Sequence, residues 1–168
     1  IAIVGAGLAG SAMAVSLADS EYSVTLLDAR PLPESENLPQ KHEARVSALT
    51  PGTIRLLRSV GAWDAIPTSR ISPYSRMHVR EADGTGEINF SAADLRVDSL
   101  GCIVENRLIL AGLHNQLKYC SNVTIDTPVT VSSCETTANG NLLRLADGRS
   151  LCASLIIAAD GARSPVRS

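Results

Sequence analysis

The residues of this chain with recognisable chemistry begin with a glycine cluster near its first residue. Gly5, Gly7 and Gly10 form the pattern G-x-G-x-x-G between an apolar run at residues 1–4 and an alanine-rich helix expected over residues 8–19. In such a turn the first glycine permits a tight bend, the second lets a pyrophosphate approach the backbone, and the third lets helix and strand pack closely. The N-terminus of the helix offers unpaired N–H groups and the positive end of its dipole to phosphate. The pattern therefore predicts a dinucleotide site.

Asp28 supplies the second part of this prediction. It lies eighteen positions after Gly10, at the end of an apolar strand expected at residues 23–27. A carboxylate there can hydrogen-bond a pair of ribose hydroxyls. It would also repel a 2′-phosphate, so NADP is disfavoured at this particular site. The alternative is a glycine turn followed by a surface aspartate.

The elements that must position these residues read as one α/β domain. Strand, helix and strand at the start form a βαβ unit, whose crossover should be right-handed. Alternation and turn signals then predict the remaining elements. They are a polar excursion at 29–43, a helix at 51–60 capped by Thr50, a hairpin at 76–90, a helix at 106–119, a strand at 123–125, a β-meander from 129 through a turn at 147–148, and a strand at 155–159 that ends on Asp160-Gly161.

Composition excludes several other classes of protein. The 168 residues are 45% hydrophobic and 19% charged, which is ordinary for a globular domain and unlike a disordered or coiled-coil chain. A net charge of −2 argues against a basic surface that would bind nucleic acid. Five aromatic residues argue against a surface on which bases would stack. The uncharged stretch at residues 1–18 is interrupted by glycine and serine, so we expect neither a membrane span nor a targeting segment. Because the chain starts on a strand without Met, we expect its true N-terminus to lie upstream.

The cysteines and histidines show no metal-binding pattern. No two of the four cysteines have C-x-x-C spacing, which favours free thiols in a reducing compartment over the alternative of a secreted disulfide framework. His42, His78 and His114 lack ligand spacing and are expected to be core or surface residues. This spacing gives no indication of a metal site.

Three further segments carry a family resemblance. They are R-V-S-A-L-T-P at 45–51 followed by G-A-W-D at 61–64, G-C-I-V-E-N at 101–106, and A-A-D-G-A-R-S-P-V-R at 158–167. In this order and spacing the chain resembles the FAD-dependent aromatic hydroxylases of ubiquinone biosynthesis, which are relatives of para-hydroxybenzoate hydroxylase. The resemblance covers essentially all 168 residues.

The resemblance implies a Rossmann-like α/β FAD-binding domain. It would have three layers, with a parallel sheet and a β-meander crossover, and would occupy residues 1–168, with residues 76–100 contributing to the substrate side. The family's G-D motif and substrate-domain strands would follow residue 168. The chain would then be an N-terminal fragment, and we do not expect it to turn over substrate alone.

The activity implied by the resemblance is flavin monooxygenation. NAD(P)H would reduce FAD, O₂ would add to the reduced ring, and the flavin hydroperoxide would hydroxylate a phenol that carries a polyprenyl tail. The cofactor would perform the difficult step, while the protein holds it and excludes water. The resemblance therefore implies no catalytic triad and no metal site. Such a substrate implies peripheral membrane contact and association with other proteins of ubiquinone biosynthesis. The implied location is the bacterial cytoplasm, at the inner-membrane face, or the matrix side of the mitochondrial inner membrane.

The resemblance also assigns cofactor-binding residues. Gly5, Gly7 and Gly10 would hold the FAD pyrophosphate, Asp28 the adenosine ribose and Arg45 the cofactor beside the flavin, while Asp160 and Gly161 form a D-G motif that contacts FAD and is implicated in NAD(P)H use. Asn106 stands where many relatives carry an arginine, with Arg107 beside it. Two interpretations of Arg107 remain open: it contacts a phosphate, or it is a solvated residue of the first helical turn. Arg163 is a candidate for a salt bridge or a pyridine-nucleotide phosphate contact. The plainer alternatives are a loop salt bridge for Arg45 and a strand-ending turn for Asp160-Gly161.

Three other functions remain open at this point. One is a related flavoprotein with a different substrate, such as a halogenase, an epoxidase or another phenol hydroxylase. The second is a plain NAD-binding Rossmann domain, which the long segment between the second and third strands, the β-meander and the D-G motif disfavour. The third is a non-catalytic nucleotide-binding module.

Overall fold

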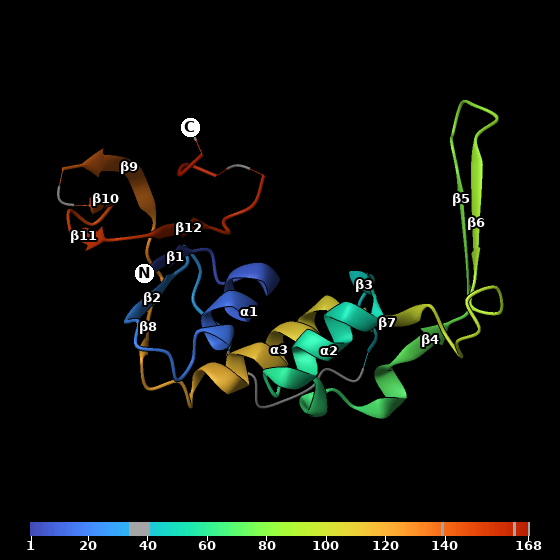
Figure 1. The fold of residues 1–168 in the computed structure, drawn as a ribbon. Helices are drawn as coiled ribbons and strands as arrows, with labels where there is room; N and C mark the ends of the chain where they lie inside the picture. The colour runs from blue at the N-terminus through green and yellow to red at the C-terminus, as the bar shows by residue number, and fades with distance from the viewer. Residues whose placement is uncertain (34–40, 139, 163, 168) are drawn as a thin grey trace. The chain divides into compact units, whose positions relative to one another are not determined.

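The structure, a computed structural model, describes residues 1–33, 41–138, 140–162 and 164–167. The chain forms two compact units, one made of residues 1–38 and 110–168 and the other of residues 39–109 (Figure 1). Part of the expected polar excursion, at residues 34–40, and the candidate Arg163 lie outside the described residues.

A parallel sheet organises the first unit. Its four strands follow the order β12-β1-β2-β8, where β1 is Ala2–Val4, β2 is Val24–Leu27, β8 is Val123–Asp126 and β12 is Ile156–Ala158. Every residue of β1 is buried, as expected for an apolar central strand covered on both faces. All four predicted parallel strands are confirmed, with ends that differ by at most one residue.

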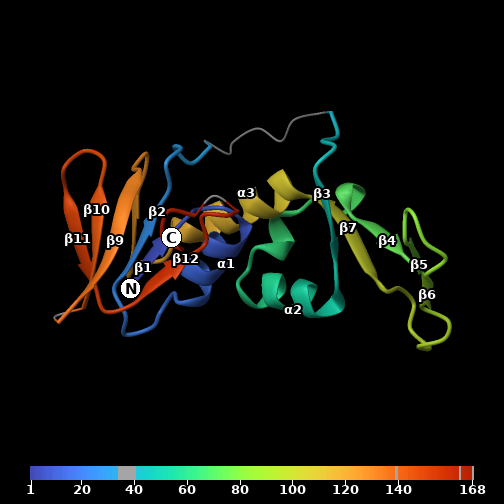
Figure 2. The ribbon, with the colours of Figure 1, turned by 90° about the horizontal axis from the view of Figure 1, so that it is seen from above.

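Two layers cover this sheet. Helix α1 (Leu8–Ser16) packs against β1 and β2. An antiparallel meander of β9 (Val131–Thr137), β10 (Gly140–Leu145) and β11 (Ser150–Ala153) takes the order β11-β10-β9 (Figure 2). One core cluster joins sheet and meander: Ala2, Val4, Leu27, Val129, Val131, Leu143 and Leu145. The predicted three-layer α/β fold with a β-meander is confirmed.

Local signals placed the helices well. Helix α2 (Pro51–Ser59) begins after Thr50, whose Oγ1 accepts a hydrogen bond from the Thr53 N–H at 3.3 Å. Helix α3 spans Asn106–Leu117, close to its expected range. Helix α1 stops three residues earlier than predicted, and Asp19 beyond it has a left-handed φ of 60°, which ends the helical path.

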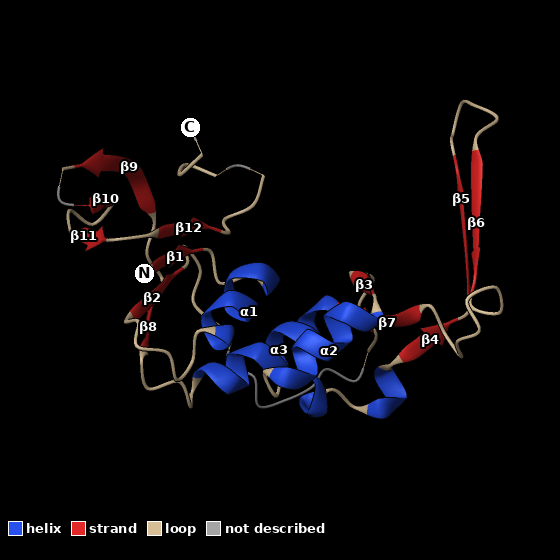
Figure 3. Cartoon of the chain, viewed as in Figure 1, coloured by secondary structure: helices blue, strands red, loops and turns tan. Residues whose placement is uncertain are grey.

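The second unit contains a small sheet that the sequence did not predict. Strands β3 (Val46–Leu49), β7 (Gly101–Glu105) and β4 (Ser72–Tyr74) pair antiparallel in the order β3-β7-β4 (Figure 3). Short 3-10 turns occupy Trp63–Ala65 and Thr68–Arg70. The predicted hairpin is confirmed as β5 (Arg76–Arg80) and β6 (Glu87–Ser91).

Two further observations on the described residues bear on the sequence predictions. All four cysteines, each within the described residues, are unpaired, in agreement with free thiols. Within the described ranges, no helix has the length and apolarity needed to cross a bilayer.

Candidate dinucleotide site

Two glycines of the G-x-G-x-x-G turn are required by the protein's own packing. Gly5 has a φ of +104°, and a Cβ built on it would lie 2.4 Å from the carbonyl oxygen of Ala159. A Cβ on Gly10 would lie 1.8 Å from the carbonyl oxygen of Gly5. Both contacts are to backbone, which cannot rotate away. The first strand, the turn and the helix therefore approach one another as closely as the motif predicts.

Gly7 is different, because no described atom lies close enough to exclude a larger side chain at this position. It is the N-cap of α1 with φ −74° and ψ −170°, and a Cβ built on it meets nothing within 4 Å. No side chain caps this helix end, so its first N–H groups are available to a ligand. Open space beside uncapped N–H groups is the arrangement that an anionic pyrophosphate requires.

Asp28 is held rigidly beside this turn. Its Oδ2 accepts a hydrogen bond from the Ala6 N–H, and its Oδ1 accepts one from the Arg30 N–H, both at 2.8 Å. Its side chain is only 15% exposed and lies 3.7 Å from the Arg30 Nε. Each carboxylate oxygen keeps a lone pair, so the pair of oxygens can still accept from ribose hydroxyls.

Two hollows of the first unit meet at Asp28. One, of about 200 Å³, is also lined by Gly7 and His114. The other, of about 250 Å³, is also lined by Gly5 and Asp160. Three predicted positions at the ends of β1, β2 and β12, namely Gly5, Asp28 and Asp160, thus line one hollow, as the carboxyl ends of parallel strands should.

Asp160 carries the strongest sign of a missing partner. It follows β12, and its Oδ2 is buried without a hydrogen-bond partner among the described residues. A buried carboxylate oxygen without a donor is costly, and it fits a site completed by a hydroxyl or N–H group of a ligand. Gly161 next to it has a φ of +87°, so the D-G pair also forms a turn that favours glycine. The residues present therefore fit a bound dinucleotide.

Arg45, Asn106 and Arg107 belong to the second unit. The Asn106 N–H donates to the Arg45 carbonyl at 3.0 Å, and the Asn106 Oδ1 accepts from the Ser47 hydroxyl at 2.6 Å. The Arg45 side chain is exposed and forms no ion pair with a described residue. Its guanidinium remains free for an anion, and its predicted place beside the flavin stays a prediction.

Glu105 is a residue that sequence reasoning missed. It is 4% exposed, and its carboxylate accepts from Arg70 on Oε1, from Arg107 on Oε2, and from the Glu43 N–H at 2.7 Å. Burial raises the pKa of this carboxyl, but the backbone bond from Glu43 and the bonds from the two arginines outweigh it and lower the pKa to about 2. The cluster ties the segment before Arg45 to the start of α3. No sequence signal revealed it, because Arg70 lies 35 positions away.

The same cluster determines where the Arg107 side chain lies. Its Nε donates to Glu105 Oε2 at 2.9 Å, and its Nη2 contacts the Lys41 carbonyl. The guanidinium is thus engaged with Glu105 rather than extended into solvent, and a contact between Arg107 and phosphate stays a prediction.

His114 is a second residue without a role in the sequence analysis. It is 5% exposed, and its Nε2 lies 3.1 Å from the Ala6 carbonyl oxygen and 3.2 Å from the Ser11 Oγ. Burial lowers the pKa of the imidazole, although the bond to Ala6 and the charge of Asp28 oppose this. An imidazole whose pKa is lowered by burial therefore lies under the glycine turn.

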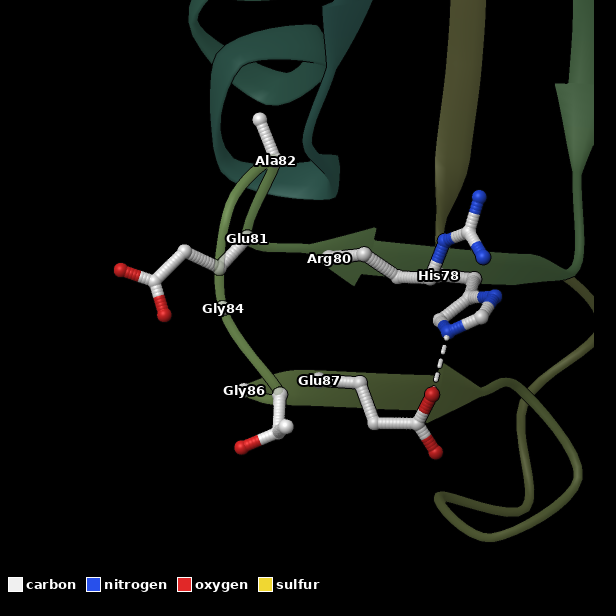
Figure 4. Close-up of a pocket in the computed structure, with 8 residues that line it drawn as sticks. His78, Arg80, Glu81, Ala82, Gly84, Gly86 and Glu87 are labelled. Atoms are coloured by element: carbon white, nitrogen blue, oxygen red, sulfur yellow. Dashed lines mark hydrogen bonds and ion pairs between the residues drawn. The ribbon is translucent and has the colours of Figure 1, made fainter.

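A third hollow, at the β5–β6 turn, does not resemble a binding site. It has a volume of about 590 Å³ and is lined by residues 78–87 of one hairpin (Figure 4). All of its lining residues are exposed, including His78 and Glu87, which pair at 3.2 Å. Nothing there excludes water from a bound molecule.

A parallel sheet whose first strand runs through a G-x-G-x-x-G turn into a helix, with an acidic residue ending the second strand, defines a dinucleotide-binding α/β protein. A family model described as "FAD binding domain" matches residues 1–168, so the chain belongs to the FAD binding domain family. This assignment confirms FAD as the predicted dinucleotide and argues against a plain NAD-binding domain.

The chain is also similar to individual proteins along its whole length. It is 35% identical over 168 residues to 3-demethoxyubiquinol 3-hydroxylase of Escherichia coli (strain K12), covering 99% of this chain and 42% of that protein. It is 36% identical over 181 residues to ubiquinone biosynthesis monooxygenase COQ6, mitochondrial, of Xenopus tropicalis, covering 100% of this chain and 39% of that protein. The chain thus spans about two-fifths of the length of these relatives.

Solved structures agree on the fold. A variant of Klebsiella pneumoniae HpxO complexed with FAD superimposes with a TM-score of 0.65 at 26% identity, over 99% of this chain and 40% of that chain. The p-nitrophenol 4-monooxygenase PnpA from Pseudomonas putida DLL-E4 gives a TM-score of 0.73 at 22% identity, over 99% and 42% of the two chains.

Proposed function

We propose that this chain is the FAD-binding part of a monooxygenase that hydroxylates the aromatic ring of a polyprenyl phenol in ubiquinone biosynthesis. The observation that carries the proposal is the similarity, over the whole of this chain and about two-fifths of each relative, to ubiquinone hydroxylases of bacterial and mitochondrial origin, in a chain of the FAD binding domain family. The geometry of the glycine turn, Asp28 and Asp160 supports the cofactor half of the proposal.

The first unit would hold the adenosine diphosphate half of FAD. The N–H groups at the start of α1, beside Gly7, would bind the pyrophosphate, while the backbone-anchored carboxylate of Asp28 would accept from the ribose hydroxyls. Asp160 would use its unpartnered Oδ2 to accept a hydrogen bond from a cofactor hydroxyl, and Gly161 would shape the turn.

Arg45, Asn106 and Arg107 are proposed as further cofactor-binding residues. The exposed guanidinium of Arg45 would bind cofactor oxygens, and Asn106 would hold the Arg45 backbone through its N–H. Arg107 would reach phosphate only if its bonds to Glu105 loosened. Bound FAD supplies the redox chemistry with O₂, and NAD(P)H is the proposed electron donor. The protein's own residues bind and orient the cofactor and exclude water from it.

Residues 76–100 would contribute to the substrate side. In the β5–β6 hairpin, Met77 pairs with Phe90 and Val79 with Ile88, which places four apolar side chains on one face. Val79 is 49% exposed and Ile88 58% exposed. An apolar face of this kind suits the side of an enzyme that meets a lipophilic phenol. Peripheral contact with the bacterial or mitochondrial inner membrane, and association with other proteins of the pathway, belong to the same proposal.

The test begins with the complete gene product. Its visible spectrum is recorded, released cofactor is identified by chromatography, and NADH and NADPH oxidation and O₂ uptake are followed with a polyprenyl phenol in detergent. We expect FAD and ring hydroxylation of the polyprenyl phenol. Asp28→Arg should weaken FAD binding, whereas Asp83→Arg, the same charge change at an exposed hairpin position, should not. A protein that cannot be reconstituted with FAD would overturn the proposal.

A second candidate is an FAD-dependent hydroxylase of a different aromatic ring. The observation in its favour is the shared fold with p-nitrophenol 4-monooxygenase, although that similarity shows the fold alone. Hydroxylation of small phenols without turnover of the polyprenyl phenol would favour this candidate.

A further inference from the structure

His114 lies directly under the glycine turn of the first unit. It is on α3, 108 positions from Ala6 in the sequence, and its Nε2 is 3.1 Å from the Ala6 carbonyl oxygen. Ser11 of α1 completes a triangle, because its hydroxyl donates to the same carbonyl at 3.0 Å and lies 3.2 Å from the His114 Nε2. Two buried side chains therefore converge on one backbone oxygen of the turn.

The chemistry of these atoms determines which nitrogen carries the proton. A carbonyl oxygen can only accept, so the His114 Nε2 must be the donor. The Nδ1 is buried and has no hydrogen-bond partner among the described residues, as befits the lone pair of a neutral ring. The side chain is 5% exposed, so its N–H is directed at Ala6 without competition from solvent.

The direction of the Ala6 carbonyl matters because of the next N–H in the chain. A trans peptide is planar, and its C=O and N–H groups point in opposite directions. When His114 and Ser11 hold the Ala6 carbonyl toward the protein interior, the Gly7 N–H is turned the other way. Gly7 is the uncapped N-cap of α1 and has open space beside it.

The other peptide of Ala6 is also restrained. The Ala6 N–H donates to Asp28 Oδ2 at 2.8 Å, so both peptide groups flanking this residue have buried or partly buried partners. A turn held on both sides cannot rotate one N–H freely. The binding geometry of the Gly7 N–H is thus set before any ligand arrives, which lowers the entropic cost of binding.

We propose that His114 is a positioning residue for the pyrophosphate of FAD, which acts by holding the Ala6–Gly7 peptide so that the Gly7 N–H faces the phosphate. This inference rests on the proposed FAD-binding function of the same turn. It differs from a packing role, because packing needs only the volume of the ring, whereas positioning needs the Nε2 donor.

The test compares variants that separate donor from volume in the full-length protein. His114→Leu removes the donor, and His114→Gln keeps an N–H donor at a similar distance along the side chain. Leu117→Ala is the matched control, because Leu117 is 2% exposed on the same helix and does not line the hollow beside Gly7. The readouts are the FAD dissociation constant and the ³¹P NMR shifts of bound FAD, together with the melting temperature.

We expect His114→Leu to bind FAD about tenfold more weakly, the effect of one lost hydrogen bond. At least one pyrophosphate resonance of the bound cofactor should shift toward that of free FAD. His114→Gln should restore both readouts, and Leu117→Ala should lower the melting temperature without changing either. If His114→Leu does not fold, Ser11→Ala removes the other hydrogen bond to the same carbonyl and should weaken FAD binding about threefold to tenfold.

Three results would overturn the inference. The first is unchanged FAD affinity and unchanged ³¹P shifts in His114→Leu, or in Ser11→Ala if His114→Leu does not fold. The second is an equally large loss of FAD affinity in Leu117→Ala, and the third is failure of His114→Gln to restore FAD binding. A wild-type protein that binds no FAD would instead refute the proposed function itself, so the two failures are distinguishable.

Discussion

Replacing the glycines of the turn one at a time should separate folding from binding. Gly10→Ala places a Cβ 1.8 Å from the Gly5 carbonyl oxygen, whereas real Cβ contacts essentially never fall below 3.0 Å. Helix and strand must therefore move apart by about 1.2 Å. Overpacking of this kind costs about 1–3 kcal/mol when side chains can yield. Because both atoms here belong to the main chain or are fixed to it, we expect at least about 3 kcal/mol, a large share of a typical stability of about 5–15 kcal/mol.

Gly7→Ala should leave the stability of the fold almost unchanged and weaken FAD binding. The added methyl meets no described atom within 4 Å, and φ −74° suits alanine. We expect the free energy of unfolding to change by less than about 1 kcal/mol, since the weaker N-cap is offset by the less flexible unfolded chain. The methyl would occupy the space where pyrophosphate approaches. Loss of a hydrogen bond to a charged group, about 1.5–3 kcal/mol, predicts FAD binding weaker by about tenfold to a hundredfold.

The assay measures both properties in the full-length apoprotein. Urea unfolding followed by circular dichroism gives the free energy of unfolding, and quenching of flavin fluorescence gives the FAD dissociation constant. A Gly10→Ala variant as stable as the wild type would refute the close approach of helix and strand. A Gly7→Ala variant that binds FAD with unchanged affinity would refute the placement of pyrophosphate at this helix end.

Three further predictions concern stability. Burial lowers the pKa of His114, so the folded state resists protonation of this side chain. The contribution of His114 to the free energy of unfolding should be full above about pH 6.5 and should fall as the pH drops below it. Urea unfolding at several pH values measures this pH dependence, which should be absent in His114→Leu. The pKa of Glu105 is lowered to about 2, so its contribution to the free energy of unfolding should persist above about pH 4.5 and disappear as the pH falls toward 2. Glu105→Gln should be less stable at pH 7, and its stability should fall less steeply in acid. An unchanged fall of stability in acid would contradict the ion-pair cluster. Thr50→Ala should lower the free energy of unfolding by about 1 kcal/mol in thermal denaturation, with Thr85→Ala in an exposed turn as the neutral control.

The sequence alone predicted the parts of the molecule that depend on neighbours in the chain. The G-x-G-x-x-G turn, the Thr50 cap and the β5–β6 hairpin are specified by residues a few positions apart. Backbone sterics and local hydrogen bonds act over that distance, so a short pattern is enough to predict them. The parallel strands were predictable for a related reason, because short apolar runs that alternate with a helix have few other arrangements.

The tertiary structure decided what joins residues far apart. In the β3-β7-β4 sheet, Val46 pairs with Glu105. These strands are too short, and too mixed in apolar and polar residues, to be recognised from the sequence alone. Glu105 meets Arg70 across 35 positions, and His114 meets Ala6 across 108. A charged or polar side chain carries no local mark of its partner, since the pairing depends on how the chain folds back. Sequence therefore determined the cofactor turn, whereas folding brought His114 under that turn in the first unit and gathered Arg70 and Arg107 around Glu105 in the second unit.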